Sequence, residues 1–168
     1  MGETVIQVSS LGKRIKGKTI LEDISFEINR GDCVALIGPN GAGKTVLMSC
    51  ILGDKKPSSG QVLIDGKAGK AKNKIAVLLQ ENTIPNSLKV EELIAFFQSI
   101  SDNPLTNQEV QDLLQFKEDQ YQQFADKLSG GQRRLLAFVL CLIDKPKILF
   151  LDEPTAGMDT STRQRFWE

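Results

Sequence analysis

Apolar residues follow two different patterns in the chain's expected strands. Between residues 19 and 28 they fall on every second position, which places Ile20, Ile24, Phe26 and Ile28 on one face. This period predicts a half-buried strand of an antiparallel sheet. Other short runs are continuously apolar, as in parallel strands that are buried on both faces. These runs are residues 33–37, 75–79 and 148–151.

A third pattern, with apolar residues three and four positions apart, predicts helices in the second half of the chain. It covers residues 90–100, a stretch after the capping-box pair Thr106 and Glu109, and the apolar segment 131–143. Buried strands separated by loops and helices indicate an α/β protein with a parallel sheet. Because strand patterns are missing between residues 81 and 127, we expect a helical insertion there. The predicted parts are residues 1–80 (first part of the core), 81–127 (helical subdomain) and 128–168 (return to the core).

The composition narrows the classes of function. The chain has 168 residues, which suits one domain or one domain with a small inserted lobe. Its 21 basic and 21 acidic side chains leave a formal net charge of zero, so bulk attraction to nucleic acid has no support. The absence of histidine excludes imidazole metal sites and histidine-dependent nucleophile pairs. Proton transfer must then use carboxylates, lysine or tyrosine.

Cysteine usage and the apolar runs predict where the protein works. The three cysteines, at positions 33, 50 and 141, are far apart and lie among apolar neighbours. We therefore expect reduced, buried thiols in a cytosolic setting. The start of the chain lacks the pattern of a signal peptide, and the apolar run 135–143 is too short to span a bilayer.

Residues 38–45 read GPNGAGKT, which fits the phosphate-loop pattern G-x-x-x-x-G-K-T. The pattern lies between a predicted buried strand and a predicted helix over 44–52, the context in which it binds phosphate. Glycines let successive N–H groups turn toward phosphate oxygens, and the helix dipole adds attraction. Lys44 would reach the β- and γ-phosphates, and the Thr45 hydroxyl would ligate Mg²⁺. The alternative is an ordinary glycine turn that begins a helix.

Two adjacent carboxylates, Asp152 and Glu153, follow the predicted strand 148–151. The carboxyl ends of parallel strands form the edge where α/β proteins bind ligands. Because neighbouring side chains point in different directions, the two carboxylates should have different roles. Asp152 would hold Mg²⁺, and Glu153 would orient or deprotonate the attacking water. A solvated acidic turn before Pro154 is the alternative interpretation.

Residues 128–132 read LSGGQ and precede the helix predicted over 131–143. Ser129 and Gln132 have the spacing of a capping box, and the start of a helix that carries a serine hydroxyl is also a site for an anion. Together with the phosphate loop before it and Asp152 and Glu153 after it, this motif resembles the signature of the ATP-binding cassette ATPases. The resemblance runs along essentially the whole chain, with Gln80 at the Q-loop position and residues 154–159 at the D-loop.

The resemblance implies a P-loop NTPase fold: a mixed or parallel sheet, an antiparallel N-terminal β region and a helical insertion. It implies ATP as the ligand together with Mg²⁺, with Glu153 as general base and Lys44 as charge stabiliser. Thr45, Gln80 and Asp152 would form the environment of the metal. The residues expected to bind ATP are Gly38, Pro39, Asn40, Gly41, Ala42, Gly43, Lys44, Thr45 and Val46, with Ser129, Gly130, Gly131 and Gln132 from a second cassette.

The resemblance also implies partners. Two cassettes, identical or different, would pair head to tail around ATP, with Asp159 joining the two sites. A transmembrane permease subunit would hold the cassette on the inner face of the cell membrane, and no nucleic acid would be bound. The expected function is ATP hydrolysis that drives transport. A cassette of the chromosome-maintenance type is disfavoured because the phosphate loop and the signature lie close together and the net charge is neutral.

Two departures from the family pattern leave an alternative open. Ile15 stands where the family usually has an aromatic residue that stacks on adenine. The family's switch histidine is expected about one strand past residue 159, and the chain stops at residue 168 with no histidine. We expect a truncated piece of a longer cassette. The alternative is a nucleotide-binding regulatory module in which hydrolysis is impaired.

Overall fold

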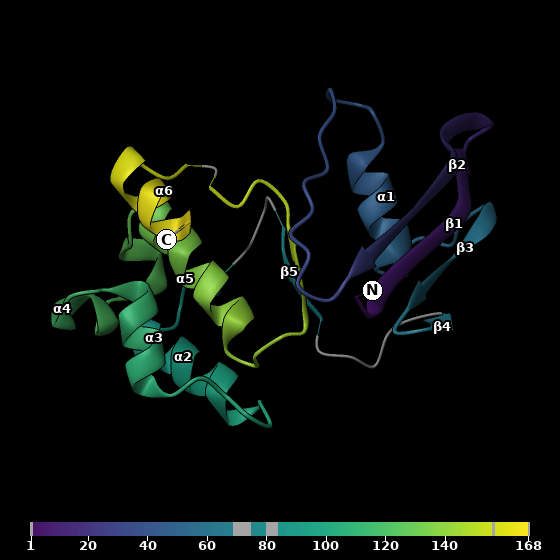
Figure 1. Cartoon of the computed structure of the whole chain (residues 1–168). Helices are drawn as coiled ribbons and strands as arrows, with labels where there is room; N and C mark the ends of the chain where they lie inside the picture. The colour runs from purple at the N-terminus through teal and green to yellow at the C-terminus, as the bar shows by residue number, and fades with distance from the viewer. Residues whose placement is uncertain (1, 69–74, 80–83, 156, 168) are drawn as a thin grey trace. The chain divides into compact units, whose positions relative to one another are not determined.

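The structure is a computed structural model that describes residues 2–68, 75–79, 84–155 and 157–167. The chain divides into two compact units, Met1–Lys72 and Asn73–Glu168, and each is described by itself. Figure 1 shows strands β1 to β4 and helix α1 in the first unit, and β5 with helices α2 to α6 in the second. The finer division into three parts at residues 80 and 127 stays a prediction.

The first unit is built on a four-stranded antiparallel sheet with the order β2-β1-β3-β4. The long strands β1 (Thr4–Ile15) and β2 (Lys18–Asn29) form a hairpin, and β3 (Ser59–Ile64) and the short β4 (Lys67–Ala68) complete the sheet. The antiparallel strand predicted over residues 19–28 is confirmed as β2. Strand β1 was not singled out from the sequence.

A bulge in β2 changes which of its residues is buried. Leu11 pairs with Ile24, but Lys13 pairs with Leu21, so β2 has one residue more than β1 between these pairs. Asp23 takes a left-handed conformation there, with φ 47°. The bulge interrupts the period-two alternation, and Leu21 is buried although the pattern does not include it. Ile20, Ile24, Phe26 and Ile28 are all half-buried, as the prediction of a half-buried strand requires.

Helix α1 (Lys44–Ile51) packs on β2 and buries Leu47, Cys50 and Ile51. Gly53, with φ 79°, follows its end, as the sequence predicts. The apolar run 33–37 before it is not a strand in the structure, contrary to expectation. A strand exists only where a neighbour completes its hydrogen bonds, and residues 33–37 do not pair with any strand of this unit's sheet. Cys33 is exposed, against the prediction of a buried thiol.

The second unit contains a parallel pair, β5 (Ile75–Leu78) and β6 (Ile148–Leu151), in register from Ile75 and Ile148 to Leu78 and Leu151. Helix α5 (Gly130–Leu142) packs against β5, and its buried residues form the centre of the hydrophobic core. Helix α6 (Thr160–Trp167) contacts α5 near the end of the chain. The apolar strands expected over residues 75–79 and 148–151 are thus confirmed.

The region between β5 and α5 is helical, as the sequence predicts. It contains α2 (Val90–Ser99), α3 (Asn107–Leu114), the short α4 (Glu118–Tyr121) and the 3-10 turn η1 (Ala125–Lys127). Helices α2 and α3 both pack on α5, and their buried residues join the same core. These residues are Val90, Leu93, Ile94, Val110 and Leu114. Within the described part of the chain, none of the helices is both long and apolar enough to cross a membrane.

The capping box predicted before α3 is formed. The Thr106 hydroxyl accepts a hydrogen bond from the Glu109 amide at 3.2 Å, and the Glu109 carboxylate accepts one from the Thr106 amide at 2.6 Å. Both bonds lower the pKa of Glu109, and the bond from the Thr106 backbone amide has the larger effect. Lys145 adds a smaller effect in the same direction.

We expect this pairing to give the chain an acid-sensitive part of its stability. A carboxyl whose pKa is lowered on folding stabilises the fold above its unfolded pKa and loses that contribution as the pH falls. The loss should begin below about pH 4.5, the ordinary value for glutamate. A carboxyl-carbon NMR titration of Glu109 should give a midpoint below this value. In Thr106→Ala the midpoint should rise and unfolding should cost about 1 kcal/mol less. Equal midpoints in the two proteins would contradict the assignment.

Candidate functional site

The phosphate loop leads directly into α1 in the first unit. Residues 38–42 are exposed, and the Ala42 amide donates to the Pro39 carbonyl at 3.2 Å, which closes a turn. Gly41 and Gly43 take left-handed conformations, with φ 82° and 91°. Such φ values are strained for residues with a side chain, so the glycines of the motif are required by the shape of this loop.

Gly43 is required for a second reason, which is its contact with β2. A Cβ atom at this position would lie 2.9 Å from Leu21 Cδ2 and 3.2 Å from the Ile20 carbonyl oxygen. No such neighbour limits Gly41, where a Cβ would meet nothing within 4 Å. The close approach therefore anchors the last glycine of the loop on the sheet.

The first turn of α1 is arranged to receive an anion. Its N-cap residue is Gly43, so no side chain caps the amides at this end of the helix. Lys44 begins the helix, and its Nζ donates to the carbonyls of Gly38 at 2.7 Å and Pro39 at 2.9 Å. The loop is thereby folded around the lysine ammonium group. Thr45 is exposed and Val46 is half-buried. Helix-end amides and an adjacent lysine are the donors that phosphate oxygens prefer, so these residues fit a nucleotide phosphate.

The acidic pair lies at the carboxyl end of β6 in the second unit. The Asp152 amide donates to the Leu78 carbonyl at 2.8 Å, which continues the ladder between β5 and β6 by one residue. Asp152 is half-buried, whereas Glu153 is exposed and has a left-handed backbone with φ 46°. The two carboxylates thus have different surroundings, as different roles would require.

The signature motif forms the start of α5. The Ser129 hydroxyl accepts from the Gln132 amide at 3.2 Å, and the Gln132 side chain accepts from the Ser129 amide at 3.0 Å. The predicted capping box is therefore present. Gly131 lies against the segment before α6, because a Cβ there would be 3.4 Å from Met158 Cα and 3.6 Å from an Asp159 carboxylate oxygen. The signature turn and the D-loop segment are neighbours within one chain.

Sequence reasoning missed one residue that joins these features, Arg134. It is buried in the first half of α5, with 7% of its surface exposed. Its guanidinium donates to the carbonyls of Asp152 at 2.7 Å, Glu153 at 3.0 Å and Pro154 at 3.0 Å, and also to the carbonyl of Leu79. Burial lowers the pKa of Arg134, while Cys141, Asp152 and Glu153 raise it. An arginine at the apolar face of a predicted helix is the signal that could have revealed it.

The structure thus brings the signature helix, the D-loop segment and the acidic pair together in the second unit, while the phosphate loop belongs to the first. The predicted metal residue Gln80 lies outside the described residues. Among the residues that are described, His, Cys, Asp and Glu form no cluster of three or more that could hold a metal ion.

This set of motifs matches a known family. A family model described as "ABC transporter" fits residues 21–156, from β2 to the segment after Glu153.

The chain belongs to the ABC transporter family.

The names of relatives in the family include both export and import proteins. The chain is 34% identical over 175 residues to the Nod factor export ATP-binding protein I of Ralstonia nicotianae, covering 98% of this chain and 54% of that protein. It is also 34% identical over 164 residues to the spermidine/putrescine import ATP-binding protein PotA of Protochlamydia amoebophila, covering 92% of this chain and 44% of that protein. The chain therefore spans about half the length of these curated relatives.

The fold agrees with that of solved ABC transporter subunits. One structure, of the ATP-binding subunit of an ABC transporter, superposes with a TM-score of 0.80 at 25% identity. The match covers 96% of this chain and 71% of that one. The expected P-loop NTPase fold, with antiparallel and parallel strands and a helical region, is confirmed.

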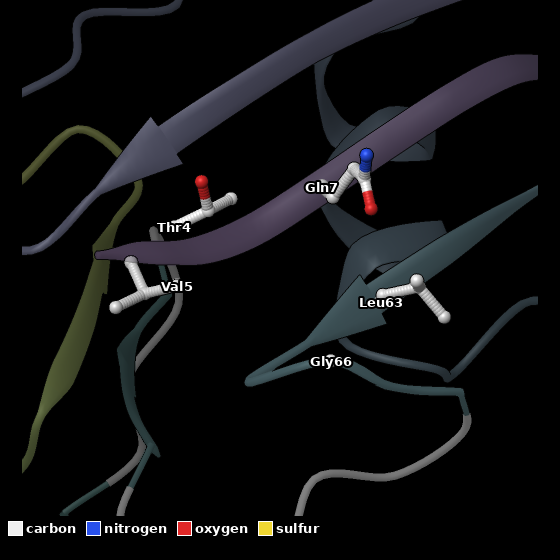
Figure 2. Close-up of a pocket in the computed structure, with 5 residues that line it drawn as sticks. All are labelled: Thr4, Val5, Gln7, Leu63 and Gly66. Carbon is white, nitrogen blue, oxygen red and sulfur yellow. The ribbon is translucent and has the colours of Figure 1, made fainter. Parts of the chain in front are cut away.

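A hollow elsewhere in the first unit of this ABC transporter chain is unsuited to a nucleotide. Figure 2 shows it on β1 and β3, and its lining contains no charged residue. Its volume is about 80 Å³, whereas ligand pockets generally measure about 300 Å³ or more. The lining residues are Thr4, Val5, Gln7, Leu63 and Gly66.

Two glycine substitutions in the phosphate loop should have different costs. Gly41→Ala and Gly43→Ala both place a side chain at a left-handed φ, which costs about 1–2 kcal/mol. Gly43→Ala also forces a Cβ against Leu21 and Ile20, which adds about 1–3 kcal/mol of overpacking. Urea unfolding should therefore show a clearly larger loss of stability for Gly43→Ala. Equal losses would mean that the contact with β2 does not hold the loop.

Proposed function

We propose that this chain is the ATP-binding subunit of an ABC-type membrane transporter, which binds Mg-ATP and hydrolyses it in a head-to-tail dimer of cassettes. The observation that carries the proposal is the start of α1. There the helix end has no side-chain cap, and the loop before it contains two left-handed glycines. The Lys44 ammonium group donates to a carbonyl of the same loop. This is a cradle for the phosphates of a nucleotide.

In this proposal the first unit binds the phosphates. The amides of Gly38 and of residues 40–46 would donate to phosphate oxygens, whereas Pro39 has no N–H to donate. Lys44 would move its Nζ from the loop carbonyls to the β- and γ-phosphates. Thr45, Asp152 and Gln80 would hold Mg²⁺, directly or through water. When bound, the ion would neutralise phosphate charge.

Glu153 would act as the general base. Its carboxylate would take a proton from water as the water oxygen bonds to the γ-phosphorus. The bond from that phosphorus to the bridging oxygen would break, releasing ADP and phosphate. Its exposed position at the end of β6 supports this role, because a base must reach solvent and substrate.

The remaining residues would act across a dimer. Ser129, Gly130, Gly131 and Gln132 of one cassette would contact ATP on the other, since the start of α5 also presents amides to an anion. Hydrolysis would remove this shared ligand and loosen the pair. A permease subunit would place the assembly at the inner face of the cell membrane. The names of relatives include both export and import proteins, so we assign no cargo or direction.

A second candidate is a nucleotide-binding module that hydrolyses ATP poorly. The aliphatic Ile15 at the adenine-stacking position favours it. It differs from the first candidate in turnover, not in binding.

Steady-state ATP turnover separates the two functions. With an active protein, Glu153→Gln should lower kcat roughly 100-fold or more because the base is lost, while ATP still binds. Glu118→Gln removes an exposed carboxylate of α4 by the same chemical change and should leave turnover at the wild-type level. If Glu153→Gln retained ATP turnover, Glu153 would not be the general base. Binding of ATP without turnover in the wild type would favour the regulatory module.

A further inference from the structure

We propose that Arg134 is a positioning residue, which fixes the backbone that carries Asp152 and Glu153 and couples it to the signature helix. The inference deepens the proposed function and rests on it for its catalytic part. Its structural part, the holding of the acidic segment by α5, stands on contacts within the second unit.

The guanidinium of Arg134 binds backbone carbonyls just past the ends of β5 and β6. Arg134 Nε donates to the Pro154 carbonyl, and one terminal nitrogen donates to both Asp152 and Glu153. The other terminal nitrogen donates to the Leu79 carbonyl, just past β5. These four acceptors are backbone oxygens, so the arginine holds the course of the chain at Leu79 and at residues 152–154.

Burial of the Arg134 guanidinium costs free energy unless its hydrogen bonds are made. A charged group with 7% exposure has lost most of its water, and only directed hydrogen bonds compensate for that loss. Arginine offers five N–H donors in a rigid planar fork, whereas lysine concentrates its donors at one point. A lysine at position 134 could not reach carbonyls on both strands at once.

The backbone of Glu153 has a strained conformation. A residue with a side chain at φ 46° is in a sparsely populated region and stays there only when its surroundings determine it. Arg134 binds the carbonyl of Glu153 and those of the residues before and after it. These bonds hold the backbone on both sides of the proposed base.

Arg134 is carried by the helix that the signature motif begins. Arg134 lies one turn after Gly130, the first residue of α5, and Ser129 caps that helix. A shift of α5 produced by contact at the signature turn would move the guanidinium, and with it the carbonyls around Glu153. The signature of a cassette would in this way sense its partner's ATP and adjust its own acidic pair.

The test compares Arg134→Lys and Arg134→Met with Arg133→Lys. Arg133 is the adjacent arginine, but it donates to the Ile84 carbonyl and the Asn86 side chain. We measure hydrogen exchange of the Asp152 amide, which bonds to Leu78, together with amides inside α5 and the kcat and KM for ATP. In both Arg134 variants the Asp152 amide should exchange about tenfold faster or more while α5 stays protected. The kcat should fall about 10- to 100-fold with KM changed less than about threefold, because misplacement of a base affects the chemical step. Arg133→Lys should match the wild type in every measurement.

Each other result overturns part of the proposal in a recognisable way. Unchanged exchange at Asp152 in Arg134→Lys would overturn the structural part. Faster exchange with unchanged kcat in an active protein would overturn the catalytic part. Loss of protection throughout α5 in both Arg134 variants would assign the arginine to core packing instead. If wild type and Glu153→Gln bind ATP equally without turnover, the proposed function fails, and the Asp152 amide alone decides whether Arg134 holds the segment.

Discussion

The second unit depends on how backbone carbonyls are satisfied where β5 and β6 end. Strand pairing stops after Leu78 and Leu151, with one further bond from the Asp152 amide. Beyond that point the carbonyls of Leu79 and of residues 152–154 still need donors. Arg134 supplies them from α5, so the end of the sheet, the acidic pair and the signature helix form one hydrogen-bonded unit.

The same requirement is met in different ways at the ends of the helices. Helices α3 and α5 begin with hydroxyl side chains, Thr106 and Ser129, which accept bonds from their own amides. Helix α1 begins with Gly43 and has no such cap. A helix end without an internal acceptor suits a ligand that brings its own oxygens. At α1 this open helix end lies beside the left-handed Gly41 and the Lys44 ammonium group, and together they suit a phosphate.

Much of this was predictable from sequence, because periodicity and capping are local properties. The helices, the parallel strand pair, and the capping boxes at Thr106 and Ser129 are confirmed. The burial of Leu21 and the fate of residues 33–37 depend on a bulge and on strand partners, which local patterns do not contain. Arg134 was missed because its role comes from contacts 18 to 20 positions away with Asp152, Glu153 and Pro154. The site residues were named from motifs, and their roles stay proposals.

The left-handed conformation of Glu153 has an evolutionary consequence. Glycine adopts this conformation without strain, so selection for stability alone would favour glycine at position 153. A glycine would also delete the carboxylate. If the carboxylate is needed, selection for stability and selection for activity oppose each other at this position. Gains in stability must then come from other parts of the protein.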